Sequence, residues 1–154
     1  MTRRERVLAA IAHRQPDRVP IDLGAMRSTG ITAIAYGRLK KYLGLSGGGT
    51  HVYDVVQQLA QPEPAILDYV EADVVDLGRA FLTADEDWQD FELPDGSPAK
   101  VPAYVRFRPD GAGGRLVLGR SEEAIGAMPA GAFYLSQMRW PLREWDGRDL
   151  GVLD

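Results

Sequence analysis

The chain has no cysteine among its 154 residues and only two histidines, His13 and His51. Without cysteine, these residues can form no disulfide, no thiolate nucleophile and no thiolate zinc site. Two histidines are also too few for a metal site built from histidine alone. The sequence therefore predicts no metal site within this chain.

The chain also lacks a long apolar run and an excess of positive charge. No stretch approaches the roughly 18 apolar residues that would indicate a membrane-spanning helix. The basic start Met1–Arg4 is followed by no apolar segment, so no signal peptide is expected. The net charge of −4 and the pI near 5.2 argue against a nucleic acid partner, because phosphate binding needs a basic face. We expect a cytoplasmic protein that binds neither nucleic acid nor membranes.

What the chain does have is an opening stretch, Glu5 to Gly24, that combines a helix with a strand. Thr2 and Glu5 have the spacing of a capping box, which predicts a helix beginning at Arg3. Pro16 ends this helix, because its ring cannot continue it. The apolar run at 19–23 then predicts a buried strand with polar groups at its carboxyl end. This order is typical of the start of a β/α enzyme.

The next part of the chain repeats the passage from helix to strand. The pattern predicts a helix at 31–43 capped by Ser28 or Thr29 and ended by Gly44, a short helix within 52–60, a helix at 64–71 with Pro64 in its first turn, and a strand at 73–77. Two parallel strands are far fewer than the eight of a closed (β/α)8 barrel, which needs about 250 residues. This α/β pattern therefore predicts either the opening part of a longer enzyme or a compact domain completed by a partner or by dimerisation.

An antiparallel β-meander is predicted after residue 83. Three short strands at 88–93, 101–108 and 115–118 are separated by the turn sequences Pro94–Asp95–Gly96 and Pro109–Asp110–Gly111. Residues 124–132 read as a loop and 133–140 as an extended segment. The predicted organisation is a part with helices and strands at 1–83, the meander at 84–141 of the same domain, and a C-terminal tail at 142–154.

Several short motifs together carry a family resemblance. The opening reads Arg4–Glu5–Arg6–Val7–Leu8–Ala9–Ala10, then His13, Pro16–Asp17–Arg18–Val19–Pro20 and Asp22. This pattern resembles the opening of the uroporphyrinogen decarboxylase-like superfamily, and more closely its methyltransferase-type branch of corrinoid-dependent enzymes. Supporting similarity lies in 28–31, 52–55, 57–60, 73–76, 93–96 and 140–142. The resemblance implies an α/β fold, an incomplete (β/α)8 TIM barrel. Residues 1–83 would be its N-terminal portion, 84–141 its antiparallel β-meander, and 142–154 a tail at a truncation point.

The same resemblance implies a function. It points to corrinoid-dependent methyl transfer, with no cofactor in this chain, while zinc and a corrinoid protein would serve the full-length family enzyme. One alternative is a tetrapyrrole carboxyl-lyase of porphyrin biosynthesis, although such decarboxylases carry two arginines where this chain has Arg27–Ser28–Thr29–Gly30. Another is a non-catalytic remnant or split subunit, completed by a companion chain or as a homodimer.

Three residues are candidates for the site. The family's arginines near the first strand hold substrate carboxylates, which makes Arg27 the candidate for substrate binding, since a guanidinium group can pair with a carboxylate through two hydrogen bonds. Asp76 and Asp22 are the catalytic candidates, because a carboxylate can stabilise a cation that forms during reaction. Each also has a structural interpretation: Asp76 as the cap of a turn, Asp22 as a satisfied carboxylate at a strand end, and Arg27 as a surface ion pair.

Overall fold

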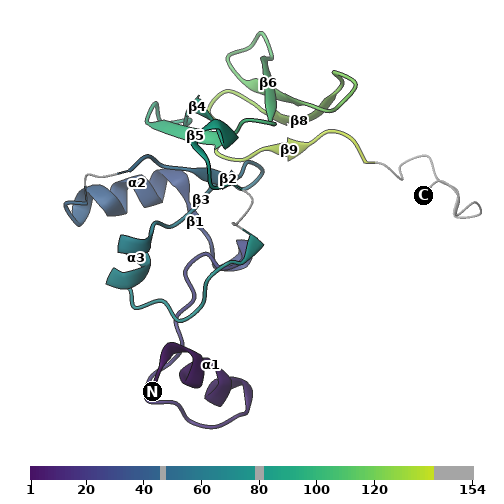
Figure 1. Ribbon diagram of the computed structural model, residues 1–154. Coiled ribbons are helices and arrows are strands. Elements are labelled where there is room, and N and C mark those ends of the chain that lie inside the picture. The colour runs from purple at the N-terminus through teal and green to yellow at the C-terminus, as the bar shows by residue number, and fades with distance from the viewer. Residues whose placement is uncertain (46–47, 79–81, 141–154) are drawn as a thin grey trace, which may run out of the picture. The chain divides into compact units, whose positions relative to one another are not determined.

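The computed structural model describes residues 1–45, 48–78 and 82–140 (Figure 1). The predicted C-terminal tail at 142–154 lies outside the described residues. The chain forms two compact units, Met1–Tyr104 and Val105–Asp154.

The first unit contains the helices and two small sheets. Its elements are α1 (Arg3–Ile11), the 3-10 helix η1 (Arg27–Thr29), β1 (Ile31–Thr32), α2 (Ala33–Tyr42), β2 (Val52–Asp54), β3 (Leu59–Ala60), α3 (Pro64–Tyr69), the 3-10 helix η3 (Asp85–Asp87), β4 (Trp88–Glu92) and β5 (Pro98–Pro102). The first sheet has the order β1-β3-β2, and β4 pairs with β5 as a separate hairpin. An isolated bridge between His51 and Lys100 joins the hairpin to the residue before β2.

The second unit is an antiparallel sheet with the order β6-β7-β8-β9. Its strands are β6 (Arg106–Pro109), β7 (Arg115–Leu118), β8 (Ala124–Met128) and β9 (Ser136–Gln137). Val105, Val117 and Met128 are its buried hydrophobic side chains among the described residues. Gly126 lies where β9 approaches β8 closely, since a Cβ there would stand 2.3 Å from Leu135 Cδ2.

The predicted α/β fold, an incomplete (β/α)8 barrel, is wrong. In the described part of the chain, three α-helices accompany three sheets, and every strand ladder is antiparallel. Helices do not alternate with parallel strands, as a barrel of this kind requires. None of the helices in the described ranges has both the length and the apolar character needed to cross a bilayer.

The two segments predicted as parallel strands, 19–23 and 73–77, have no regular secondary structure and form no ladder. The backbone amide of Asp73 donates to the carbonyl of Ile21 at 2.8 Å. The amide of Ile21 donates not to a backbone carbonyl but to Asp73 Oδ2, also at 2.8 Å. Pro20, the residue before Ile21, has no amide hydrogen to donate. The Asp73 side chain thus accepts the amide that a backbone carbonyl would accept in a ladder. Backbone pairing between the two segments therefore stops after one hydrogen bond.

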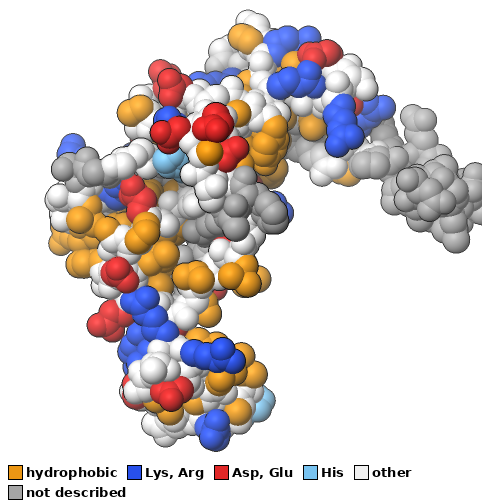
Figure 2. Space-filling view, in the orientation of Figure 1, with side chains coloured by type: hydrophobic (Ala, Val, Ile, Leu, Met, Phe, Trp, Pro, Cys, Tyr) orange, Lys and Arg blue, Asp and Glu red, His pale blue; other side chains and the backbone are white. Residues whose placement is uncertain are grey.

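Asp73 is the centre of an ion-pair cluster that joins three separate segments. Its side chain is inaccessible to solvent, and it accepts hydrogen bonds from Arg6 Nη1 at 2.6 Å and Arg18 Nη1 at 2.7 Å. Arg6 also pairs with Asp17 through Nε at 2.6 Å. Lys and Arg side chains with acidic neighbours are visible between α1 and α3 in Figure 2. The cluster holds α1, the turn at 17–18 and the segment after α3 together.

Polar side chains share the buried faces of α1 and α2 with apolar ones. In α1 the buried residues are Arg6 and Ala9, whereas Leu8 is 48% exposed. In α2 they are Ala33, Tyr36 and Lys40, whereas Tyr42 is 86% exposed. Arg6 and Lys40 can be buried because each pairs with a carboxylate, Arg6 with Asp73 and Lys40 with Glu63.

Glu63 satisfies the polar ends of the buried α2 residues. The Tyr36 hydroxyl donates to Glu63 Oε2 and accepts from the Glu63 amide, both at 2.9 Å. Lys40 Nζ lies 2.5 Å from Glu63 Oε2. Because these groups are paired, Tyr36 can be fully buried at little cost in unmade hydrogen bonds.

The predicted helix ends are mostly confirmed. The capping box of Thr2 and Glu5 is formed, and Pro64 lies in the first turn of α3. Gly44 follows α2 with a φ of 69°, where Leu45 donates to the Lys40 carbonyl in a Schellman motif. The cap predicted at Ser28 or Thr29 is wrong, because Thr32 precedes the first turn of α2.

Two loop and helix predictions are also wrong. Residues 52–60 form β2 and β3 instead of a helix, because Asp54 Oδ1 accepts from the amides of Val56 and Gln57 at 2.9 Å each and closes a turn. The predicted loop at 124–132 contains β8, which pairs with β7. The turns at 94–96 and 109–111 are confirmed, but the single meander is divided between two sheets.

We expect Asp73→Asn to destabilise the first unit by about 3 kcal/mol, because the substitution leaves two arginines facing an uncharged buried amide. The free energy of unfolding, measured with denaturant, would test this. Asp68→Asn is the matched control, since Asp68 forms only an exposed pair with Arg3 and should cost less than about 1 kcal/mol. Equal losses in the two variants would contradict the central position of Asp73.

Acid should weaken the same cluster. Hydrogen bonding to Arg6 holds the pKa of Asp17 well below its usual range. Burial would raise the pKa of Asp73, but bonds from the Ile21 amide, Arg6 and Arg18 outweigh it, and the pKa is lowered. Both carboxylates bind protons less readily in the folded state, so their stabilisation is present above about pH 4 and is lost as the pH falls through the lowered values.

The midpoint of thermal unfolding should therefore fall between about pH 5 and about pH 2. The fall should be smaller in Asp73→Asn, which lacks one of the two carboxylates. An unchanged midpoint over this range in the original chain would contradict the assignment.

Candidate functional site

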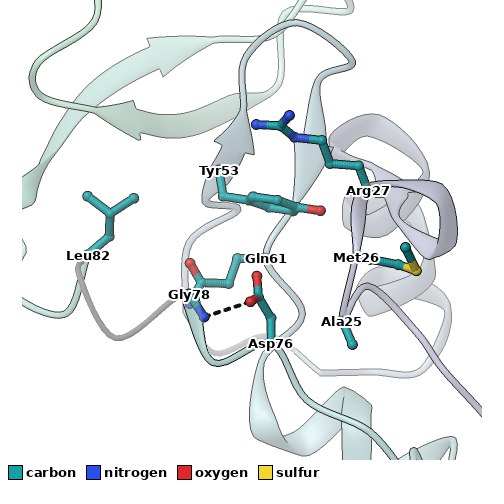
Figure 3. A pocket seen from close by; sticks show the side chains of 8 residues that line it. All are labelled: Ala25, Met26, Arg27, Tyr53, Gln61, Asp76, Gly78 and Leu82. Atoms are coloured by element: carbon teal, nitrogen blue, oxygen red, sulfur yellow. Dashed lines mark hydrogen bonds between the residues drawn. The ribbon is translucent and has the colours of Figure 1, made fainter.

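A cavity of about 320 Å³ lies in the first unit, where η1, β2 and the segment after α3 meet (Figure 3). It is lined by Ala25, Met26, Arg27, Tyr53, Gln61, Asp76, Gly78 and Leu82. Two of the three candidate residues from the sequence, Arg27 and Asp76, therefore line the same cavity. They are 49 positions apart in the chain, with α2, β2, β3 and α3 between them.

Arg27 is the first residue of η1 and is held along one edge. Its Nε lies 2.5 Å from Asp54 Oδ2, and Asp54 is buried while Arg27 is 72% exposed. Asp54 is itself fixed, because its other oxygen accepts the two amides of the turn after β2. Asp54 is the only acidic residue paired with Arg27 among the described residues. The guanidinium group is thus oriented by the protein and retains two donors for a ligand.

Asp76 lies in the segment that begins at Asp73. Its Oδ1 accepts from the amide of Gly78 at 2.7 Å, which closes a short turn. Figure 3 shows the carboxylate directed toward the side of the cavity where Tyr53 and Gln61 lie. Asp76 therefore serves the turn and also presents a carboxylate to the cavity, so the structural and functional interpretations are compatible.

The third candidate, Asp22, does not line this cavity. Its Oδ1 accepts from the amide of Ala25 at 2.8 Å and shapes the turn that leads to η1. This is the satisfied carboxylate of the structural interpretation, here in a turn instead of at a strand end. Asp22 contributes to the site by positioning the backbone of Ala25, and its catalytic role stays a prediction.

Sequence reasoning missed Tyr53 and Gln61. Tyr53 lies between the buried residues Val52 and Asp54 of β2, and alternation along a strand turns it to the opposite face. That signal was hidden because 52–60 was predicted to contain a helix. Gln61 follows β3, and its Oε1 is buried without a hydrogen-bond partner in this structure. A buried acceptor that lines a cavity is available to a donor group of a ligand.

The two histidines lie elsewhere. His13 follows α1 with a φ of 54° and takes the position that glycine usually holds in a Schellman motif. His51 packs edge-on against Trp88 with ring centroids 4.5 Å apart. Burial and the nearby Lys100 lower the pKa of His51, so it is neutral near pH 7. Neither histidine lines the Arg27 cavity.

The donor set of the cavity suits a small organic acid. A guanidinium edge can pair with a carboxylate, and the Gln61 oxygen can accept from a neighbouring hydroxyl or amine of the same molecule. The residues do not suit zinc: no group of three or more His, Cys, Asp or Glu within the described ranges could hold a metal ion. The described part of this chain therefore offers recognition and electrostatic stabilisation.

Comparison of the chain with known proteins identified no relative. No family model, no curated protein and no solved structure matches the chain. The family resemblance consequently depends on the sequence motifs alone, and the function has to be argued from the geometry of the cavity.

Proposed function

We propose that the chain is the substrate-binding component of an enzyme related to the uroporphyrinogen decarboxylase-like superfamily, in its methyltransferase-type branch. The observation that carries the proposal is the presence of Arg27 and Asp76 on one cavity. These are the positions at which the resemblance places a carboxylate-binding arginine and a catalytic aspartate. In this proposal Arg27 binds the carboxylate of a small substrate through Nη1 and Nη2.

Asp76 and Gln61 complete the proposed recognition. A carboxylate beside the substrate stabilises positive charge that develops on it, because the attraction is stronger in a cavity than in bulk water. The Gln61 oxygen accepts a hydrogen bond from a hydroxyl or amine beside the substrate carboxylate. Zinc and a corrinoid protein, which the family's methyltransferases use, would act outside the described residues of this chain.

The size and charge of the cavity favour this over tetrapyrrole decarboxylation. A porphyrinogen carries several carboxylates, and each needs a cationic partner. Arg27 is the only Lys or Arg among the described residues that line the cavity. One guanidinium group suits a substrate with one carboxylate, so the tetrapyrrole carboxyl-lyase reaction stays the second choice.

A non-catalytic subunit completed by another chain is a second candidate, and one observation favours it. The two segments that meet at Ile21 and Asp73 expose large apolar side chains, with Val19 79%, Val75 64% and Leu77 86% exposed. Large apolar side chains left exposed on two adjoining segments are typical of surfaces that another chain covers. Sedimentation of the purified chain would separate the candidates: a monomer at micromolar concentration would count against association as a homodimer.

We expect benzoate, as a simple monocarboxylate, to bind the chain and to shift the amide resonances of Gly78 and Gln61. Arg27→Gln should weaken this binding by about tenfold to a hundredfold, because a charge-assisted hydrogen bond contributes about 1.5–3 kcal/mol. Arg27→Lys should show an intermediate affinity, since it keeps the charge but loses the planar fork. Nuclear magnetic resonance titration gives these affinities directly.

Arg14→Gln is the matched control, because Arg14 is exposed and has no ion pair among the described residues. It should bind benzoate as the original chain does, and both variants should unfold at similar temperatures. Undiminished binding by Arg27→Gln would refute the proposal.

A further inference from the structure

A second and larger cavity of about 570 Å³ lies in the first unit, and none of its described lining residues belongs to the Arg27 cavity. Its walls are formed by α2, residues 48–50 and the β4–β5 hairpin. The hairpin is tied to this loop, because the amide of Lys100 donates to the carbonyl of Thr50 at 2.8 Å. A volume of this size falls within the range of small-molecule sites.

The charged side chains around this cavity are unevenly paired. Lys40 is buried and held by Glu63, while Arg38 lies 3.8 Å from Asp95. Lys41 and Lys100 form no ion pair with any described residue. Among the described lining residues, the only other acidic group is Asp90, across the hairpin from Lys100. The described side chains around the cavity thus carry an excess of positive charge, although the net charge of the chain is −4.

Apolar atoms form much of the remaining wall. Ile34 and Leu45 approach from the α2 side, and Pro98 and Ala99 from β5. Such a lining removes an apolar group of a ligand from water, with a gain of about 25 cal/mol for each Å² covered. A cavity of this kind therefore suits a molecule with an apolar body and one anionic group.

Gly37 supplies an independent observation. It lies within α2, where glycine is the least favourable residue apart from proline. Nothing in the surroundings demands it: a Cβ at this position would meet only Thr50 Oγ1, at an ordinary 3.8 Å. Its φ is not positive either. The distinct effect of Gly37 is to leave space at the cavity wall, at a cost in helix stability.

We propose that this cavity binds a small amphipathic anion, with a carboxylate or phosphate group held by Lys41 and Lys100 and a short apolar body against Ile34, Leu45 and Pro98. The ammonium groups donate charge-assisted hydrogen bonds to the anionic oxygens. The space left by Gly37 accommodates the apolar body. This site is separate from the substrate site proposed at Arg27.

Calorimetric titration with hexyl phosphate and with octanoate tests the proposal and distinguishes the two head groups. At least one of them should bind about tenfold more tightly than uncharged hexanol. The double substitution Lys41→Gln and Lys100→Gln should weaken the tighter ligand by about tenfold or more and reduce its salt dependence. Arg4→Gln, on the exposed face of α1, is the control and should bind normally.

Substitution of Gly37 separates binding from folding. Gly37→Ala should raise the midpoint of thermal unfolding, because alanine favours the helix. Gly37→Leu should weaken the tighter ligand by about tenfold, since its side chain fills space that the ligand needs. A variant that is as stable as the original chain and yet binds poorly cannot be explained by misfolding.

Three outcomes would overturn the proposal: no binding of either anion, equal binding of anion and hexanol, or undiminished binding by both Gly37→Leu and the lysine double variant. Arg27→Gln distinguishes the two cavities. It should leave the hexyl phosphate and octanoate affinities unchanged. The two proposed sites can therefore be refuted independently of each other. Loss of this binding in Arg27→Gln would assign the anions to the other cavity and would also overturn the proposal.

Discussion

The buried carboxylate of Asp73 is the constraint on which the first unit depends. A solvent-inaccessible charge is tolerated only when it is paired and hydrogen-bonded. Asp73 meets this condition by accepting from Arg6, from Arg18 and from the backbone amide of Ile21. These partners come from α1 and from the segment 18–21, so one satisfied carboxylate holds both against the segment that follows α3. The helix α1 is held mainly by this polar junction, since Leu8 on its outer side is about half exposed.

The same junction determines where the candidate site lies. Asp76 is only three residues beyond Asp73, and Arg27 is six residues beyond Ile21. Fixing Ile21 against Asp73 therefore limits how far these two side chains can separate. Asp54 then orients Arg27 through Nε, and Gly78 orients Asp76 through its amide. The electrostatic arrangement of the cavity follows from a structural ion pair that does not line it.

Local signals in the sequence predicted local structure well, whereas pairing between distant segments could not be predicted. The capping box at Thr2, the glycine at 44 and the turn at 94–96 each act within a few residues, and all three are confirmed. The helix ends at His13 and Glu71 use the same motif as Gly44 but lack glycine, so they carry no composition signal. The segments 19–23 and 73–77 have the apolar composition of strands. Their ladder is blocked by a side-chain hydrogen bond that appears only when distant residues meet.

The candidate site, too, could be predicted in its residues but not in its three-dimensional arrangement. Arg27 and Asp76 could be chosen from the sequence because resemblance places charged groups there, but their shared cavity depends on β2, which the sequence did not predict. The opening motif, which carries most of the resemblance, has a structural role in this chain. Its Arg6, Asp17 and Arg18 are engaged with Asp73 or with one another, and none lines the Arg27 cavity. The most specific part of the resemblance therefore concerns how the chain is held together. Any similarity in chemistry has to rest on Arg27 and Asp76, the two charged residues that reach the cavity without belonging to that junction.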